Sequence, residues 1–310
     1  MRSHPALACG QSHGDNMPRS IGVVISEHIT FGLVDEKHLA LTVTRYPAEG
    51  SGADQLHGMP IEDLVRVQAD EIKALAEGEP IDAIGLAYPG IVRNGVIEDS
   101  PNLHQLKGFP VEIAMREALA VRGIHARIVA SNDADVVASG IAAAHGKLDQ
   151  LVRVWTLGNG IGFGRYPTAD GIWEGGHTVI SLDPNERFCG CGGIGHMESI
   201  MGNRAMRLRF LDMEPDEVFA AAKTGDPRCA EFAILWHRAL AAATASSIHM
   251  SGPGKFYITG PNAKFVNLAF LNRCVQEMVK MSPLQGYVFE VVPKSDEIAL
   301  IGAAVNARRS

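Results

Sequence analysis

Two cysteines and two histidines lie close together in one glycine-rich stretch of the chain. Cys189 and Cys191 are separated by one glycine, His196 follows after four residues, and His177 precedes Cys189 with eleven residues between them. Four sulfur and nitrogen donors are the set that tetrahedral zinc binds in proteins. The spacing therefore predicts a structural zinc site. The alternatives are a glycine-rich turn with two small buried residues, or a redox pair, although dithiol redox motifs usually have the CxxC spacing.

A carboxylate with possible base chemistry follows an expected strand. Asn132 and Asp133 come at its end and directly before an expected helix. Ligand groups collect at the carboxyl ends of strands in α/β folds, so an aspartate at this place can serve as a general base. The simpler interpretation is that Ser131, Asn132 or Asp133 caps the helix. The sequence position alone leaves both interpretations open.

Three further features are weak signals when each is taken alone. Glu174 lies three residues before His177 in WEGGH, and Asn102 lies in the turn-like SPNL. The stretch LGNGIGFG could cradle a phosphate through its backbone N–H groups, or form a plain glycine-rich hairpin. Because no Lys-Ser/Thr pair follows it, the stretch is not a Walker A loop.

The composition excludes several classes of protein. Among 310 residues, 28 are Lys or Arg and 35 are Asp or Glu, which gives a formal net charge of -7. This balance predicts no basic face, so we expect no nucleic-acid partner. No apolar run approaches the roughly 18 residues that span a bilayer, so we expect no membrane partner.

The N-terminal residues 1–18 have no apolar core of signal-peptide length, and we expect a disordered lead-in. Met17 is a possible natural start in place of Met1. Five cysteines without an export signal predict a reducing compartment, the cytoplasm.

Strand and helix patterns alternate along the chain. Short β-branched runs predict an antiparallel meander of strands at 19–26, 29–36 and 39–48. Apolar residues at helical spacing predict helices at 60–78, 109–123, 134–148 and over most of 203–250. Further strands are expected within 82–92, 126–133, 151–166, 255–265 and 286–292, and a helix closes the chain. The repeated order of strands and helices predicts two α/β domains with a boundary near residue 130.

Together these pieces resemble the ROK family (repressors, open reading frames and sugar kinases). After about residue 20, the motifs follow the order of that family: GLAYPGIV, GVIEDSPNL, SNDAD, LGNGIGFG, WEGGH, CGCGGIGHMES, YITGPN and IALIGAAV. The pair WEGGH and CGCGGIGHMES is the most specific part. The resemblance implies a two-lobed, actin-like ATPase fold (ribonuclease H-like) with a cleft between the lobes. It implies an N-terminal lobe at 19–130, a C-terminal lobe with the zinc motif at 131–295, and a helix at 296–310 that packs back onto the first lobe.

The resemblance also implies a site for phosphate transfer from ATP with Mg2+ to a sugar hydroxyl. Asp133 would be the catalytic base. The groups that hydrogen-bond the sugar would be Asn102, Asn132, Asp133, Glu174, His177 and Glu198. The nucleotide would contact Gly158, Asn159, Gly160 and Gly260. A structural zinc would be held by His177, Cys189, Cys191 and His196, the last at a position where the family usually has cysteine. Relatives are commonly homodimers.

The nucleotide side departs from the family pattern. Where the family has an Asp-x-Gly-Gly-Thr phosphate loop, this chain has Val24-Ile25-Ser26-Glu27-His28. Asn159 replaces the threonine of a Gly-Thr-Gly loop, and Gly260-Pro261-Asn262 replaces a turn with consecutive glycines. The sugar side therefore keeps the family pattern and the donor side does not.

Three functions fit this pattern. The first is a sugar kinase with an unusual donor arrangement. The second is an enzyme that uses Asp133 for another proton transfer on a sugar, such as isomerisation or hydrolysis. The third is a sugar-binding or regulatory protein without catalysis. We expect no DNA-binding repressor, because the stretch before the first strand is too short for the helix-turn-helix of the family's repressors.

Overall fold

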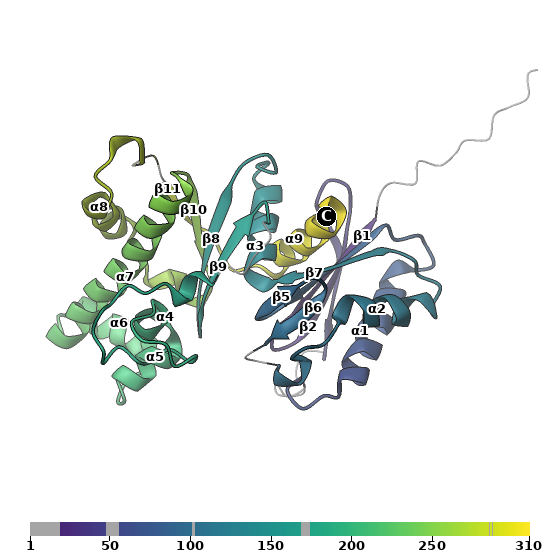
Figure 1. The fold of residues 1–310 in the computed structure, drawn as a ribbon, viewed down its shortest axis with the longest axis horizontal. Helices are drawn as coiled ribbons and strands as arrows, with labels where there is room; N and C mark the ends of the chain where they lie inside the picture. Colours follow the sequence, from purple (N-terminus) through teal and green to yellow (C-terminus); the bar gives the residue numbers. More distant parts are fainter. Residues whose placement is uncertain (1–18, 48–55, 101–102, 169–173, 285, 287) are drawn as a thin grey trace, which may run out of the picture.

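Two mixed β-sheets with helices around them form the body of the protein (Figure 1). The computed structural model describes residues 19–47, 56–100, 103–168, 174–284, 286 and 288–310. Asn102 lies outside the described residues. The first sheet has the order β3-β2-β1-β4-β7, and the second has the order β11-β10-β8-β9.

The first sheet begins with an antiparallel meander and continues with parallel strands. Its strands are β1 (Ser20–Ile25), β2 (Ile29–Val34), β3 (Ala40–Tyr46), β4 (Ala83–Tyr88) and β7 (Arg127–Asn132). Side chains alternate between the two faces of β1. Ile21 and Val23 join the core under α1 (Ile61–Ala76) and α2 (Val111–Ala120), whereas Val24 packs toward the C-terminal helix α9 (Asp296–Arg309). Helices therefore cover both faces of this sheet.

Helix α9 lies between the first sheet and α3 (Asp133–Ala144). Its residues from Ala299 to Ala307 are buried, because it contacts β1 and β4 on one side and α3 on the other. Small side chains on both helices allow this close approach, and Ser139 Oγ donates to Asn306 Oδ1 across it at 2.6 Å. The end of the chain thus fixes α3 against the first sheet.

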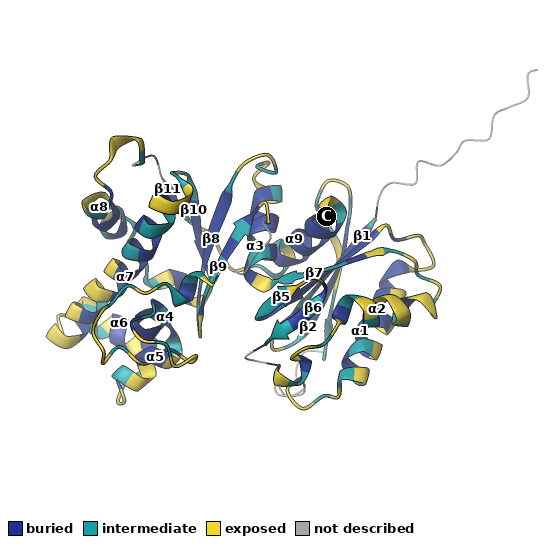
Figure 2. Cartoon of the chain, in the orientation of Figure 1, coloured by how far each residue is buried: buried dark blue, intermediate teal, exposed yellow. Residues whose placement is uncertain are grey.

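The second sheet carries a larger helical layer. Its strands are β8 (Val152–Leu157), β9 (Ile161–Tyr166), β10 (Lys255–Thr259) and β11 (Val288–Val291). The helices beside it are α4 (Glu198–Met201), α5 (Asn203–Arg209), α6 (Pro215–Thr224), α7 (Pro227–Ser251) and α8 (Leu268–Met278). Trp155, Trp236 and Phe256 are fully buried in the core that joins sheet and helices, which Figure 2 shows in dark blue. A short hairpin of β5 (Ile91–Arg93) and β6 (Val96–Asp99) completes the strands.

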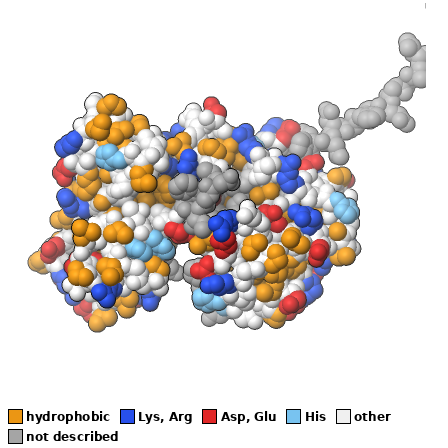
Figure 3. Space-filling view, in the orientation of Figure 1, with side chains coloured by type: hydrophobic (Ala, Val, Ile, Leu, Met, Phe, Trp, Pro, Cys, Tyr) orange, Lys and Arg blue, Asp and Glu red, His pale blue; other side chains and the backbone are white. Residues whose placement is uncertain are grey.

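Most expected elements are confirmed, including the initial meander, the hairpin of β8 and β9, and the closing helix. Helix α8 and strand β6 were not expected. Strand β7 extends through Asn132 and pairs with β4, so the first sheet runs slightly past residue 130. None of the helices in the described part of the chain has both the length and the apolar character needed to cross a membrane. On the face drawn in Figure 3, basic and acidic side chains are interspersed.

Candidate functional site

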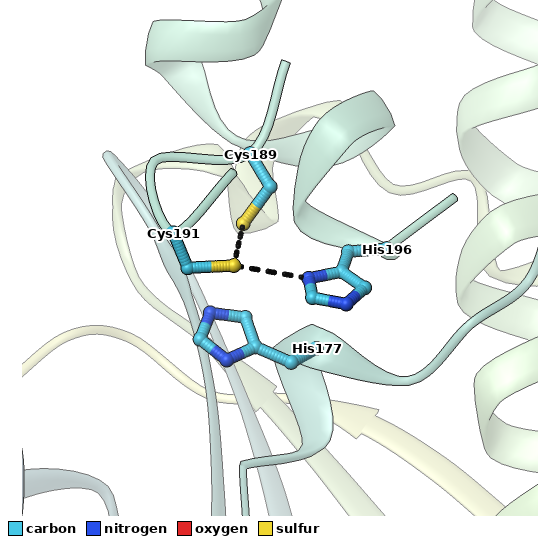
Figure 4. A group of neighbouring side chains, drawn as sticks. All are labelled: His177, Cys189, Cys191 and His196. Atoms are coloured by element: carbon cyan, nitrogen blue, oxygen red, sulfur yellow. Dashed lines mark hydrogen bonds between the residues drawn. The ribbon is translucent and has the colours of Figure 1, made fainter. Parts of the chain in front are cut away.

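The four predicted zinc ligands converge on one point (Figure 4). Cys189 Sγ lies 3.3 Å from Cys191 Sγ, which lies 3.3 Å from His196 Nδ1. With His177, all four ligand atoms lie within 4.8 Å of one another. Bonds of about 2.3 Å to sulfur and about 2.0 Å to nitrogen would place tetrahedral ligands roughly 3.3–3.8 Å apart. The donor set and its size therefore fit zinc.

Electrostatics around these four side chains agree with a metal site. Burial raises the pKa of the Cys189 thiol to about 12, so the thiol keeps its proton unless a cation is present. Burial and the neighbouring His177 lower the pKa of His196. The neutral imidazole that results is the form that binds a metal ion.

The first turn of α3 presents Asp133. Asn132 Oδ1 accepts from Ala134 N at 2.8 Å and from Asp135 N at 3.3 Å, and its Nδ2 donates to Gly90 O at 2.7 Å. Asn132 is therefore the helix cap, the simpler of the two interpretations of this stretch. Because Asn132 serves the backbone, the carboxylate of Asp133 is left to face the cleft.

The environment of Asp133 favours its protonated form. Its side chain is exposed to the cleft, yet protein surrounds it on the other sides. This burial raises the pKa of Asp133 to about 6, and the nearby charge of Glu174 contributes to the rise. The hydrogen bond that Asp133 Oδ1 accepts from Ala134 N at 2.9 Å opposes the rise. A carboxylate with a pKa close to neutral pH is suited to general base chemistry.

A cavity of about 440 Å3 extends from Asp133 along α3. Asp133, Val137, Ile141 and His145 line it, and their spacing of four places them on one side of the helix. At about 1.5 Å per residue, this side extends roughly 18 Å. The first hairpin and the segment 292–296 before α9 line the cavity as well. The cavity therefore has an acid at one end and a long, largely apolar wall.

The glycines that were expected to contact a nucleotide line this same cavity. Gly158, Gly160 and Gly260 are all part of its wall. Asn159 is not, and its Oδ1 lies 3.5 Å from Asn203 Nδ2. The sequence-based prediction did not include Val137, Ile141 and His145, although their spacing from Asp133 was a usable signal.

The remaining predicted sugar ligands lie toward the loop that carries the four predicted zinc ligands, residues 177–196, called the zinc loop below. Glu174 directly precedes the 3-10 helix η3 (Gly175–His177) and is exposed. The ring of His177 stacks on His196 with centroids 5.0 Å apart. Glu198, the first residue of α4, accepts from Ile161 N at 2.8 Å and from Cys189 Sγ at 3.4 Å. Its carboxylate thus joins the zinc loop to the turn between β8 and β9.

Comparison with known proteins decides the family. The model of the ROK family matches residues 21–310. The chain belongs to the ROK family. Glucokinase from Pyrobaculum calidifontis is 27% identical over 256 residues, which cover 77% of this chain and 83% of that protein. Glucokinase from Thermotoga maritima is 28% identical over 283 residues, which cover 78% and 84%.

Solved structures of ROK proteins share the fold. The ROK hexokinase from Thermus thermophilus has a TM-score of 0.76 at 23% identity, covering 94% of this chain and 98% of that chain. A ROK glucokinase from Streptomyces griseus, solved with glucose and AMPPNP, has a TM-score of 0.68 at 21% identity, covering 94% and 100%. The predicted actin-like ATPase fold is confirmed.

The first hairpin of this ROK protein differs from the family's phosphate loop. Ile25 pairs with Ile29, so Ser26, Glu27 and His28 alone make the turn. The backbone N–H of Ser26 donates to His28 O at 2.9 Å and is engaged within the turn. Ser26 and Glu27 are exposed. Where the family has an acid and glycines, this hairpin lines the cavity with Val24, Ile25 and Ser26, and the side chain of Ile25 is buried in the core on the other face of the sheet.

Proposed function

We propose that this ROK protein transfers phosphate from ATP to a hydroxyl of a hexose or related sugar, with Asp133 as the base. The observation that supports this most directly is the place of Asp133. It begins α3, faces the cleft, and has a pKa of about 6 at the end of a nucleotide-sized cavity. The glucokinases among its relatives support the same activity.

The proposed reaction follows from the charge of Asp133. Above its pKa the carboxylate is ionised and accepts the proton of the attacking sugar hydroxyl as the new oxygen–phosphorus bond forms. The bond to the β-phosphate oxygen breaks, and ADP leaves. Asn132, Glu174, His177 and Glu198 would orient the sugar, together with Asn102 outside the described residues.

The nucleotide would lie along α3 in this proposal. The adenosine would pack against Val137 and Ile141, near Gly260. Ser26 and Lys294 are polar residues of the cavity wall, and in this proposal they would contact phosphate oxygens. Mg2+ supplies charge neutralisation between phosphate oxygens when bound. Zinc would hold the loop of His177 and Glu198 in shape. The proposal also includes a homodimer.

A coupled assay of ADP release over a panel of hexoses tests the proposal. Asp133→Asn should lower kcat by about 100-fold or more, since general base catalysis contributes roughly 100- to 10,000-fold. Asp149→Asn is the matched control, because Asp149 is an exposed aspartate beyond the far end of α3. ADP release that is equal in wild type and Asp133→Asn would contradict the role of Asp133.

A second candidate function is sugar binding without phosphate transfer, as an enzyme of another kind or as a binding protein. The hairpin favours this candidate, because Ser26 and Glu27 replace glycines and Glu27 would repel a polyphosphate. Titration by calorimetry separates the two functions. Hexose binding without any binding of MgATP at millimolar concentration would rule out the kinase and favour the second candidate.

A further inference from the structure

Strand β9 contacts the sugar side of the site at one of its ends. The N–H of Ile161, its first residue, donates to Glu198 Oε2 at 2.8 Å. The backbone of Gly176 in η3 lies directly on the carbonyl of Ile161, where a Cβ would collide. Gly176 is next to His177, so the start of β9 holds both Glu198 and η3 in place.

The other end of β9 contacts the helix that carries the base. Gly164 lies so close to the carbonyl of Ala134 that a Cβ would collide with it. One residue further, the N–H of Arg165 donates to Asp135 Oδ1 at 2.9 Å. The last part of β9 is therefore fixed to the first turn of α3, which begins with Asp133.

We propose that Asp135 is a positioning residue that locks the base-bearing turn of α3 to β9. Through this strand, Asp135 sets the distance between Asp133 and the groups at the start of β9. A hydrogen bond from a backbone N–H to a carboxylate is stronger than one between neutral groups. A misplacement of about 1 Å in an active site can lower the rate by roughly 100-fold, so such a lock affects catalysis.

The carboxylate of Asp135 is available for this bond because another residue caps the helix. The side chain of Asn132 accepts from the N–H groups of both Ala134 and Asp135. An acid in the first turn also interacts favourably with the helix dipole, but that interaction requires no contact with β9. The bond to Arg165 N is therefore a separate feature of Asp135.

Charged groups near Asp135 lie on α3, on β9 and directly before η3. Asp133 precedes it on α3, Arg165 lies on β9, and Glu174 precedes η3. Asp296, at the start of α9, lies toward the other end of α3 and is paired with Arg45 at 2.7 Å. Burial raises the pKa of Asp135 itself to about 6, and the nearby charge of Asp133 adds to the rise.

Hydrogen exchange measured on the full chain tests the lock without any ligand. In Asp135→Ala, the amide of Arg165 should exchange at least tenfold faster than in wild type, because it loses its acceptor. Asp135→Asn keeps an oxygen acceptor and should stay within about threefold of wild type. The control Ser139→Ala removes the bonds of Ser139 to Asn306 on α9 and to the carbonyl of Asp135. Neither bond involves the N–H of Arg165, so Arg165 should stay protected. Equal protection in Asp135→Ala and wild type, or equal loss in both Asp135 variants, would overturn the proposal.

The effect of Asp135 on sugar binding and catalysis rests on the proposed function, and it is measured in separate experiments. For a hexose that the wild type binds in calorimetry, Asp135→Ala should bind at least tenfold more weakly, with Asp135→Asn restoring affinity. In the ADP-release assay, Asp135→Ala should lower kcat more than it raises KM. Asp135→Asn should keep kcat at pH 8 close to the wild-type value. Affinity and kcat equal to wild type in Asp135→Ala would overturn the positioning role.

The results that would contradict the role of Asp135 differ from the results that would contradict phosphate transfer. If the wild type releases no ADP, phosphate transfer is wrong, while exchange at Arg165 and the affinity for hexose still decide the role of Asp135. If ADP release occurs but exchange is unchanged in Asp135→Ala, phosphate transfer stands and the lock is wrong.

Discussion

The two sides of the cleft are built in different ways. On the sugar side, Asp133, Glu198 and His177 each lie on or next to an element that contacts β9 through its backbone. On the donor side, the first hairpin and the segment 292–296 meet an apolar face of α3. The two sides share α3 but otherwise depend on separate elements, so the hairpin and the segment 292–296 can change while the contacts of β9 keep their geometry.

The largest expected effect comes from the zinc loop, on which the sugar side depends. Cys191→Ser removes one of four converging ligands, so the loop loses its metal and its shape. We expect bound zinc to fall below about a tenth of the wild-type content and hexose affinity to fall about 100-fold or more. Elemental analysis and calorimetry measure the two effects.

A matched control for this change is Cys274→Ala, since Cys274 is buried in α8 away from the cluster. It should keep both zinc and hexose binding. Wild-type protein purified without zinc would contradict the assignment of the four ligands.

The pH dependence of activity is the next effect in size, and it depends mainly on the ionisation of Asp133. The base acts in its ionised form, so kcat should be level above about pH 7 and fall about tenfold per pH unit below a pKa of about 6. The measurement is ADP release between pH 4.5 and 8.5, with the coupling enzymes checked at each pH. An acid limb close to pH 4, the ordinary range of an aspartate, would contradict the raised pKa.

A smaller effect is expected at Glu27 on the donor side. Its exposed charge would repel a polyphosphate across solvent, so Glu27→Gln should lower the KM for MgATP by roughly threefold. Glu36→Gln, an exposed glutamate beyond the other end of β2, should leave that KM unchanged. A KM for MgATP that stays the same or rises in Glu27→Gln would show that Glu27 does not face the phosphates.

The smallest effect is on stability. The folded pKa of Asp133 lies above that of an unfolded aspartate, so its ionised form destabilises the fold above about pH 6. This penalty disappears as pH falls below the unfolded value, because the carboxyl is then protonated in both states. Asp133→Asn should therefore melt about 1–3 °C higher than wild type at pH 8, with the difference vanishing near pH 4. A lower melting temperature at pH 8 would show that the charge stabilises the fold.

The sequence predicted those features that depend on local patterns. Asp133 was singled out because a strand ends where a helix begins. The four predicted zinc ligands were singled out because their spacing is compact, and the structure brings them together. Helix α8 was missed, although Asn267 is a cap that its sequence offers and Leu271 and Val275 lie at helical spacing. The cap and the apolar spacing together are sufficient to predict a helix from the sequence.

Other features depend on contacts that the sequence does not show. The bond between Arg165 N and Asp135 requires the register of β9 against α3, which is set by the close approach at Gly164. The segment 292–296 reaches the cavity because α9 returns to the first sheet. The altered phosphate loop was recognised from the sequence, but the internal bond of Ser26 N required the structure.

The most direct test of the central claim is a titration of hexoses, beginning with glucose, into the zinc-loaded protein by calorimetry without nucleotide. We predict saturable binding of at least one hexose by the wild type, and loss of that binding in Cys191→Ser. Absence of binding for every hexose of the panel in zinc-loaded wild-type protein would contradict the claim that the sugar side is intact.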